Sequence, residues 1–97
     1  MNRPLAKPID TGGQPLDLRH AFIRRTTLDH ADLRDANLTG ADLTNASARH
    51  ADFTGAILDG TILRGTDLTG AIISADQLRR AIVDETTVLP EHLKKGG

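Results

Sequence analysis

Residues 31–45 read Ala31-Asp32-Leu33-Arg34-Asp35, Ala36-Asn37-Leu38-Thr39-Gly40 and Ala41-Asp42-Leu43-Thr44-Asn45. This stretch repeats one short unit that has Ala first, Asp or Asn second and Leu third. The third position stays apolar at every fifth residue in both directions along the chain. Its members are Leu18, Ile23, Leu28, Leu33, Leu38, Leu43, Ala48, Phe53, Leu58, Leu63, Leu68 and Ile73. We therefore expect these side chains to form one continuous structural core.

A second apolar series lies two residues before each member of the first. Its members are Leu16, Ala21, Thr26, Ala31, Ala36, Ala41, Ala46, Ala51, Ala56, Thr61, Thr66 and Ala71. After Leu16 every member is Ala or Thr, so this position has room only for a small side chain. Leu16 is too large for it, and we expect Leu16 to plug the first turn of the structure.

A period of five residues fits neither of the regular secondary structures. In an α-helix, five residues advance by about 500°, so the Leu positions would scatter around the helix. In a straight strand, side chains alternate between two faces, so an odd step sends successive Leu residues to opposite faces. The chain must therefore bend once in every unit. Stacked coils then pair their backbones at a spacing of about 4.8 Å, as in β-solenoids.

The quoted units resemble the repeat of pentapeptide-repeat proteins, and the resemblance extends over residues 16–75. In that family four units complete one turn of a right-handed helix with a square section. The resemblance therefore implies an all-β solenoid, a right-handed quadrilateral β-helix of about three turns. Residues twenty positions apart should lie above one another in this fold.

The core positions contain one small and one oversized residue, and the two are neighbours in the repeat. Ala48 stands where most units have Leu, and Phe53 is the aromatic member of the next unit. Close-packed interiors require matched volumes. We interpret the pair as compensation, in which Phe53 fills the space that Ala48 leaves.

The repeat divides the chain into an irregular N-terminal arm at 1–15, the β-helix at 16–75, and a C-terminal capping helix and tail at 76–97. Ser74 and Gln77 form the pattern of a capping box, which predicts a short helix over residues 75–82. After Ile73 the apolar register persists weakly, through Leu78, Val83, Val88 and Leu93. We expect the helix to cover the open end of the last turn, because an open turn exposes unpaired strand edges.

Composition narrows the class of function. The chain has 97 residues, 12 Lys and Arg against 13 Asp and Glu, and no cysteine. This balance gives no strong field for nucleic acid or an anionic membrane, so we expect neither as a direct partner. Residues 1–8 lack the apolar run of a signal peptide, and no stretch has transmembrane length. We therefore expect a cytoplasmic protein.

The sequence contains no catalytic constellation and no cofactor motif, and we predict neither an enzyme nor a cofactor. His30 and His50 should stack on one face with Asp29 nearby, an arrangement that could hold a metal ion. Two histidines at an exposed corner are more often simply solvated, and we assign no metal site. The glycines at the fifth position of many units fit the turns there rather than a phosphate-binding loop.

Two non-enzymatic functions are compatible with the repeat. The first is a protein-interaction or scaffolding module. The second follows from the resemblance, because some pentapeptide-repeat proteins bind a type II topoisomerase, DNA gyrase, by imitating duplex DNA. Residues 16–75 hold eight Asp and six Arg, so arginines interrupt the acidic rows such mimicry needs. Three turns would also be only about 15 Å tall. We therefore place the interaction module first.

Four large apolar residues occupy the outward second position of the unit, where Asp, Asn, Thr or Ser is usual. They are Phe22, Ile57, Ile62 and Ile72. The three isoleucines belong to the third turn and would form an apolar collar near its C-terminal end. A contiguous apolar patch usually has a cover. The tail between Val83 and Leu93, an unknown partner protein, or a second copy in a homodimer through the ends could each supply it.

Overall fold

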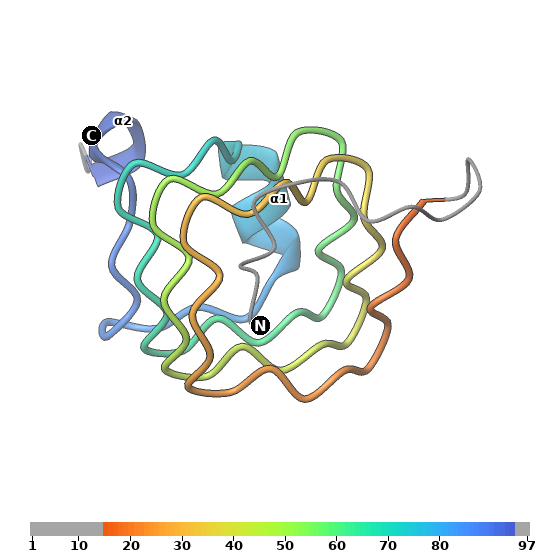
Figure 1. Cartoon of the computed structure of the whole chain (residues 1–97). Coiled ribbons are helices and arrows are strands. Elements are labelled where there is room, and N and C mark those ends of the chain that lie inside the picture. Colours follow the sequence, from red (N-terminus) through yellow and green to blue (C-terminus); the bar gives the residue numbers. More distant parts are fainter. Residues whose placement is uncertain (1–14, 95–97) are drawn as a thin grey trace, which may run out of the picture.

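The computed structural model describes residues 15–94. Except for Pro15, the predicted N-terminal arm therefore lies outside the described residues. From Leu16 onward the chain winds into a stacked coil, in which each turn lies beside the next (Figure 1). Parallel bridges join residues twenty positions apart, for example Asn37 to Ile57 and Asp42 to Ile62. Each unit contributes one bridge residue rather than a longer strand.

Two kinds of backbone hydrogen bond build the coil. Within a turn, the N–H of Ala36 donates to the carbonyl oxygen of Leu33 at 3.1 Å, and this contact closes the bend between units. Between turns, the N–H of Leu38 donates to the carbonyl oxygen of Ile57 at 2.8 Å. The N–H of Asn37 donates in the other direction, to Leu16 at 2.9 Å. Backbone polar groups are thus satisfied by neighbouring turns.

The side chains that the period places inside are buried through most of the coil. Leu33, Leu43 and Leu63 have no exposed surface, and neither do Ala48 and Phe53. The core at the predicted positions runs from Leu28 to Ile73, together with the Ala series from Ala31 to Ala71. Leu16, Leu18 and Ile23 in the first turn pack against this core but are only partly buried. No described residue stacks on their N-terminal side.

Threonine replaces alanine twice inside the coil, and both hydroxyl groups are satisfied. Thr61 and Thr66 are fully buried. Each hydroxyl donates a 2.7 Å hydrogen bond to a backbone carbonyl oxygen of the preceding turn, that of Leu38 for Thr61 and that of Leu43 for Thr66. A buried hydroxyl is costly only when it lacks a partner, so the narrow interior tolerates both residues.

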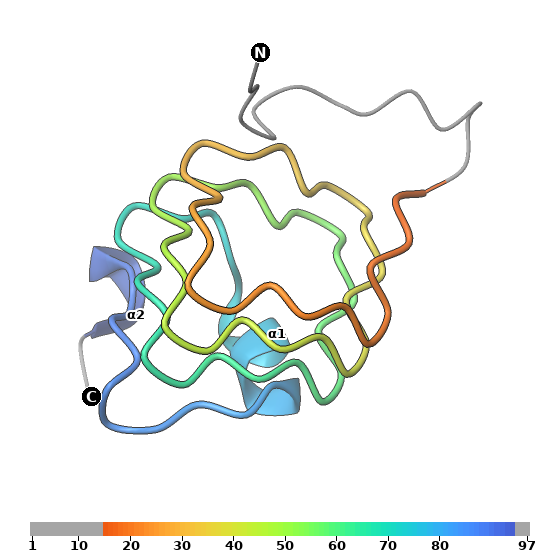
Figure 2. The ribbon, with the colours of Figure 1, turned by 60° about the horizontal axis from the view of Figure 1, so that its bottom comes forward.

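Helix α1 (Ala75–Arg80) follows the third turn and carries the predicted capping box. The Ser74 hydroxyl accepts the N–H of Gln77, and the Gln77 side chain accepts the N–H of Ser74. Leu78 joins the core. The side-chain amide of Gln77 also donates to the carbonyl oxygens of Phe53 and Ala56, at 2.8 and 2.9 Å. The helix therefore provides donors for backbone carbonyl oxygens near the end of the coil. Figure 2 looks into the ring of coils, with α1 at the far end of the coil.

The helix is shorter than the predicted 75–82, because the chain returns to an extended conformation at Ala81 and Ile82 bridges to Ile62. The tail then runs beside the third turn as a partial fourth turn (Figures 1 and 2). Val88 bridges to Asp67, a spacing of 21 residues rather than twenty. The predicted apolar register is therefore wrong at Val83 and Val88, which are exposed. Leu93, in helix α2 (Glu91–Lys94), packs on the core.

Candidate protein-interaction surface

The outward second position of the unit has a structural task wherever it holds Asp or Asn. The side-chain oxygen accepts the backbone N–H two residues further on. Asp42 accepts the N–H of Thr44 at 3.0 Å and its hydroxyl at 2.5 Å, and Asn37 does the same for Thr39. The other carboxylates that cap in this way are Asp17, Asp32, Asp52 and Asp67. The acidic position thus stabilises each bend of the coil.

Hydrogen bonds lower the pKa of Asp17, Asp32, Asp42 and Asp67. The hydroxyl and the N–H of Thr44 lower the pKa of Asp42, and those of Thr69 act likewise on Asp67, where the hydroxyl has the larger effect. The Arg19 side chain is the main cause of the low pKa of Asp17, about 2. The hydrogen bonds of the coil therefore favour the charged form of these carboxylates.

Arginine side chains lie across the acidic rows. Arg34 pairs with Asp32 at 2.7 Å, and Arg24 reaches Asp42 in the next turn at 3.5 Å. Arg49 lies 4.0 Å from Asp67. The guanidinium groups are more than half exposed, so each pair adds little stability. Together they leave a surface of mixed charge rather than continuous acidic rows.

The four outward apolar residues of the sequence are exposed to different degrees. Phe22 is 85% exposed, Ile72 56% and Ile57 44%, whereas Ile62 is half-buried. They lie on three sides of the coil, because the bridges place Ile57 above Asn37, Ile62 above Asp42 and Ile72 above Asp52. The structure thus brings the isoleucines to one level, while Phe22 lies two turns below Ile62.

Each of these substitutions also removes a backbone cap. The residues two positions after Phe22, Ile57 and Ile62 are Arg24, Asp59 and Arg64. Within residues 15–94, no side chain accepts their backbone N–H groups. The N–H of Ser74, which follows Ile72, is instead accepted by Gln77 at 2.8 Å. An aliphatic side chain at this position therefore exposes apolar surface and gives up a local hydrogen bond.

The tail lengthens the apolar surface instead of covering it. Ile82 continues the row of Ile62 and is 38% exposed, and Val88, 39% exposed, lies beside Asp67 on the remaining side. Ile57 and Ile72 keep their exposure with the tail in place. Ile82 and Val88 were not predicted as surface residues from the sequence. For Ile82 the signal was present, since it lies twenty residues after Ile62; for Val88 the extra residue in the tail concealed it.

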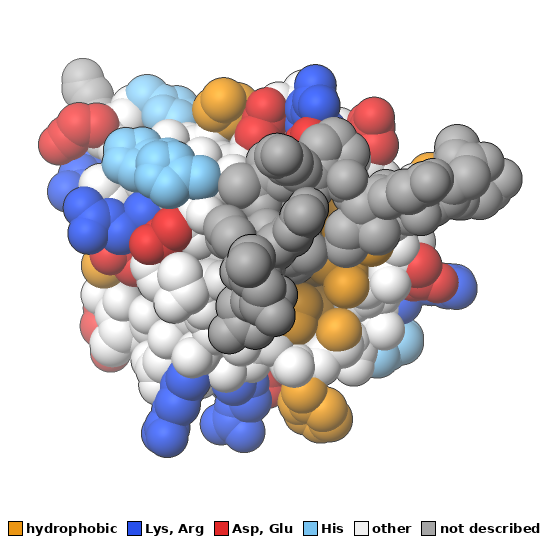
Figure 3. All heavy atoms as spheres, in the orientation of Figure 1, with side chains coloured by type: hydrophobic (Ala, Val, Ile, Leu, Met, Phe, Trp, Pro, Cys, Tyr) orange, Lys and Arg blue, Asp and Glu red, His pale blue; other side chains and the backbone are white. Residues whose placement is uncertain are grey.

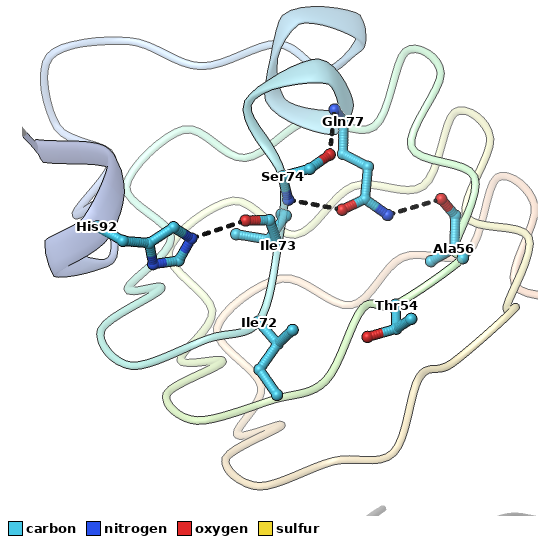
Figure 4. Close-up of a pocket in the computed structure, with 8 residues that line it drawn as sticks. Thr54, Ala56, Ile72, Ile73, Ser74, Gln77 and His92 are labelled. Carbon is cyan, nitrogen blue, oxygen red and sulfur yellow. Dashed lines mark hydrogen bonds between the residues drawn. The ribbon is translucent and has the colours of Figure 1, made fainter.

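A groove of about 470 Å³ lies where α1 and α2 meet the third turn (Figure 4). Ile72 lines it together with Thr54, and His92 approaches from α2. The His92 ring nitrogen Nε2 lies 3.0 Å from the carbonyl oxygen of Ile73, which ties α2 to the coil. The side chains of Thr54, Ser74 and Gln77 in the groove are engaged in hydrogen bonds within the coil and α1, so the groove offers mainly an apolar wall.

His30 and His50 stack as the repeat predicts, with ring centroids 5.0 Å apart and the rings within 13° of parallel. Asp29 does not turn toward them. Its carboxylate accepts the Ser47 hydroxyl and the N–H of Arg49 in the next turn, at 2.5 and 3.0 Å. No group of three or more metal-ligating side chains forms among the described residues.

From unit 16–20 to unit 66–70, the last position has a left-handed backbone, with φ between 54° and 75°. Glycine adopts this conformation without strain, and in the third turn it occupies the position at Gly60, Gly65 and Gly70. There is a second reason at Gly70, because a Cβ atom there would collide with the imidazole of His50. The glycines therefore serve the bends, and no phosphate-binding loop is formed by them.

This geometry defines a β-solenoid repeat protein that has an exposed apolar surface near its C-terminal end. The model of the family of pentapeptide repeats matches the chain in eight copies, over residues 16–47, 36–74 and 49–82. The chain belongs to the pentapeptide repeat family. The fold of this family is a right-handed quadrilateral β-helix, and its members are typically structural or interaction proteins.

Two solved structures from cyanobacteria have the same fold. A pentapeptide repeat protein from Cyanothece 51142 shares 33% identity with a TM-score of 0.71, covering 78% of this chain and 52% of that one. HetL from Nostoc sp. strain PCC 7120, involved in heterocyst differentiation regulation, shares 37% identity with a TM-score of 0.56. That match covers 68% of this chain and 29% of HetL, so the chain spans about half or less of either relative. No curated protein sequence matches the chain.

Among residues 15–94, no helix has the length and apolar character needed to span a membrane.

Proposed function

We propose that the chain is a non-enzymatic protein-interaction module that binds a partner protein through the apolar collar of Ile57, Ile62 and Ile72. One observation carries the proposal. Ile57 and Ile62 stand where Asp or Asn would cap the backbone, and Ile57 and Ile72 remain 44% and 56% exposed after the tail has folded. A change that costs the coil a hydrogen bond and leaves apolar surface in water is explained by a contact with another molecule.

The groove beside Ile72 supports the same function. It is an open apolar hollow next to the collar, bounded by α1 and α2. Apolar side chains in a concave site provide the anchors on which most protein interfaces depend. A partner that inserts one aliphatic or aromatic side chain there would bury Ile72 and contact Ile57 around the corner of the coil. HetL is involved in heterocyst differentiation regulation, which is compatible with a role of this kind.

Mimicry of DNA toward a type II topoisomerase is the alternative that the sequence left open. The observations favour the interaction module, because most outward carboxylates cap backbone N–H groups and arginines lie among them. A supercoiling assay with the purified protein separates the two functions. Inhibition of the topoisomerase at stoichiometric concentration would support mimicry and count against the proposal. The expected cytoplasmic location stays a prediction.

The decisive experiment changes Ile57, Ile62 and Ile72 together to Thr, a residue that the repeat uses at the same position. Purified wild-type protein and the triple variant are compared for partners captured from the native host, and each candidate is then tested by titration with purified components. We expect a partner that binds the wild type and loses at least about tenfold in affinity for the variant. Equal binding to both proteins would reject the collar as the site. A thermal melt checks that the variant is folded.

A further inference from the structure

One side of the coil carries a row of outward residues with apolar ends. It consists of residues 21–25, 41–45 and 61–65 and the tail residues 81–85, and we name it the Phe22 face. Bridges join Phe22 to Asp42, Asp42 to Ile62, and Ile62 to Ile82, so these four residues form one straight row. Phe22 at one end is 85% exposed and Ile82 at the other 38%.

Charges are separated along the same face. Arg24 and Arg25 lie at the end of Phe22, and Asp84 and Glu85 follow Ile82 at the opposite end. All four side chains are exposed. Figure 3 shows a projecting hydrophobic side chain beside Lys or Arg side chains along the lower edge of the molecule, where residues 20–25 run in Figure 1. The face therefore has a basic apolar end and an acidic apolar end.

We propose that the Phe22 face binds a second copy of the chain in an antiparallel, two-fold symmetric dimer. The two-fold axis lies in the plane between the two faces, at right angles to the coil axis and midway between the levels of Asp42 and Ile62. It places Phe22 against Ile82 of the second copy. The same operation brings the end of one copy that carries Arg24 and Arg25 to the end of the other copy that carries Asp84 and Glu85. In a two-fold interface each contact occurs twice, so both apolar contacts and the opposite-charge contacts at both ends form together.

Other arrangements of the same two faces lack this complementarity. If the axis is shifted to the level of Asp42, that carboxylate meets its own copy, and Arg24 meets Arg64. If the two coils instead run parallel, the end with Arg24 and Arg25 in one copy meets the same end in the other copy. Like charges across an interface are costly, so they select against both arrangements. At the other edge of the face His20 lies opposite Arg80, whose guanidinium already pairs with Asp76.

The size of the face sets the strength of the dimer. One side of a four-turn coil is about 19 Å tall at a spacing of about 4.8 Å per turn. Two such faces bury an area at the low end of specific interfaces, below about 1,200 Å². We therefore expect reversible, concentration-dependent association through the side of the coil. The ends, through which the sequence suggested a homodimer, are less suitable because α1 occupies the C-terminal one.

The proposal is tested by light scattering and sedimentation of the purified full chain from low micromolar to millimolar concentration. We expect the mass to rise toward that of a dimer and to fall again at high salt, because the charged contacts are exposed. Phe22→Thr should weaken the association by about tenfold or more, since it removes the aromatic anchor at both ends. Phe22 is outside the core, so a thermal melt of this variant should match the wild type.

A charge exchange tests the predicted register. Arg25→Glu or Glu85→Arg alone should weaken the dimer, and the double variant should restore it, because the pair is re-formed with reversed sign. Neither side chain forms an ion pair within residues 15–94, so each is free to be changed. Ile72→Thr is the matched control, an exposed apolar residue on another side, and should leave the mass unchanged.

Several outcomes would overturn the dimer. A monomer at every concentration, a dimer that persists unchanged in Phe22→Thr, or a double exchange that fails to restore the mass would each reject it. Ile62 belongs to both surfaces, so the collar is tested separately by partner binding of the Ile57→Thr and Ile72→Thr variants, which leave the Phe22 face unchanged. The inference and the proposed function can therefore fail separately.

Discussion

The hydroxyl group of Thr61 donates a 2.7 Å hydrogen bond to the carbonyl oxygen of Leu38, one turn earlier in the coil. That oxygen also accepts the N–H of Ala41 at 2.9 Å. A small side chain is required at this position, and Thr satisfies the requirement while adding a bond between turns. The interior of the β-helix is thus held by side-chain hydrogen bonds as well as by its backbone ladder.

The first prediction concerns this bond. Thr61→Val keeps the shape of the side chain and removes the donor, while Leu38 retains its bond from Ala41. We expect the free energy of unfolding to fall by about 1 kcal/mol, the usual net value of one hydrogen bond. Thr26→Val is the matched control, because Thr26 occupies the same repeat position but is exposed. Chemical denaturation measures both, and equal losses would contradict the assignment.

The second prediction concerns the Leu stack. Leu43→Ala removes a fully buried side chain from a coil whose backbone is bonded on both sides and cannot close around the space. We expect a loss of about 2–5 kcal/mol in the free energy of unfolding. Leu18→Ala in the partly buried first turn should cost clearly less. A comparable loss for both substitutions would show that the first turn contributes as much packing as the second.

The third prediction tests the compensation between Ala48 and Phe53. Both side chains are fully buried, and the compensation hypothesis holds that Phe53 fills the volume next to Ala48. Ala48→Leu restores the usual residue of the repeat and should nevertheless destabilise the protein by about 1–3 kcal/mol, because the core becomes overpacked. The melting temperature decides the matter: a rise would mean that Ala48 leaves a void, and the compensation would be wrong.

The sequence was sufficient for the features that depend on periodicity and local chemistry. The spacing of five identified Leu33, Leu43 and Leu63 as core residues. A helix or a straight strand would scatter these side chains, whereas a coil that bends once in every five residues turns all of them inward. The capping box followed from Ser74 and Gln77, because both of its bonds lie within one helical turn.

The features that depend on contacts between turns could not be read in the same way. One added residue before Val88 changes the register of the tail, and no local signal marks where the extra residue lies. Asp29 caps Arg49 from the turn below, although the pattern of the repeat assigns that task to the outward residue of the same unit, which here is Ser47. The groove arises from the way α1 and α2 pack, and that packing is not encoded in the repeat.

The fourth prediction concerns acid stability. Hydrogen bonds lower the pKa of Asp42 and Asp67 in the folded chain, so the unfolded chain binds protons more readily. Their contribution is complete above the pKa of an unfolded Asp, about 3.9, and is lost as the pH falls through the lower folded value. For Asp17 that value is about 2. We therefore expect stability to fall from about pH 4 toward pH 2.

Asp42→Asn separates the charge from the cap. Asn37 shows that an amide oxygen can accept the same two hydrogen bonds. The variant should therefore unfold near the wild-type temperature at neutral pH and lose less stability in acid, because it has one carboxyl group fewer to protonate. Thermal melts at neutral pH and near pH 3 provide the comparison. An acid response identical to that of the wild type would mean that Asp42 does not contribute to it.

The last prediction concerns the bends of the third turn, where Gly60 and Gly70 have φ of 67° and 71°. A Cβ atom added at Gly60 would meet only the backbone nitrogen of Gly40, at 3.9 Å, whereas at Gly70 it would meet the imidazole of His50. Both alanine variants lose the freedom of glycine in a left-handed conformation, which costs about 1 kcal/mol. Gly70→Ala should cost more, since the His50 ring must also move away from its stack with His30. The free energy of unfolding measures the difference, and changing His50 to Gly should reduce it. If Gly60→Ala proves as harmful as Gly70→Ala in the presence of His50, the imidazole does not constrain this corner, and glycine is required there for its backbone alone.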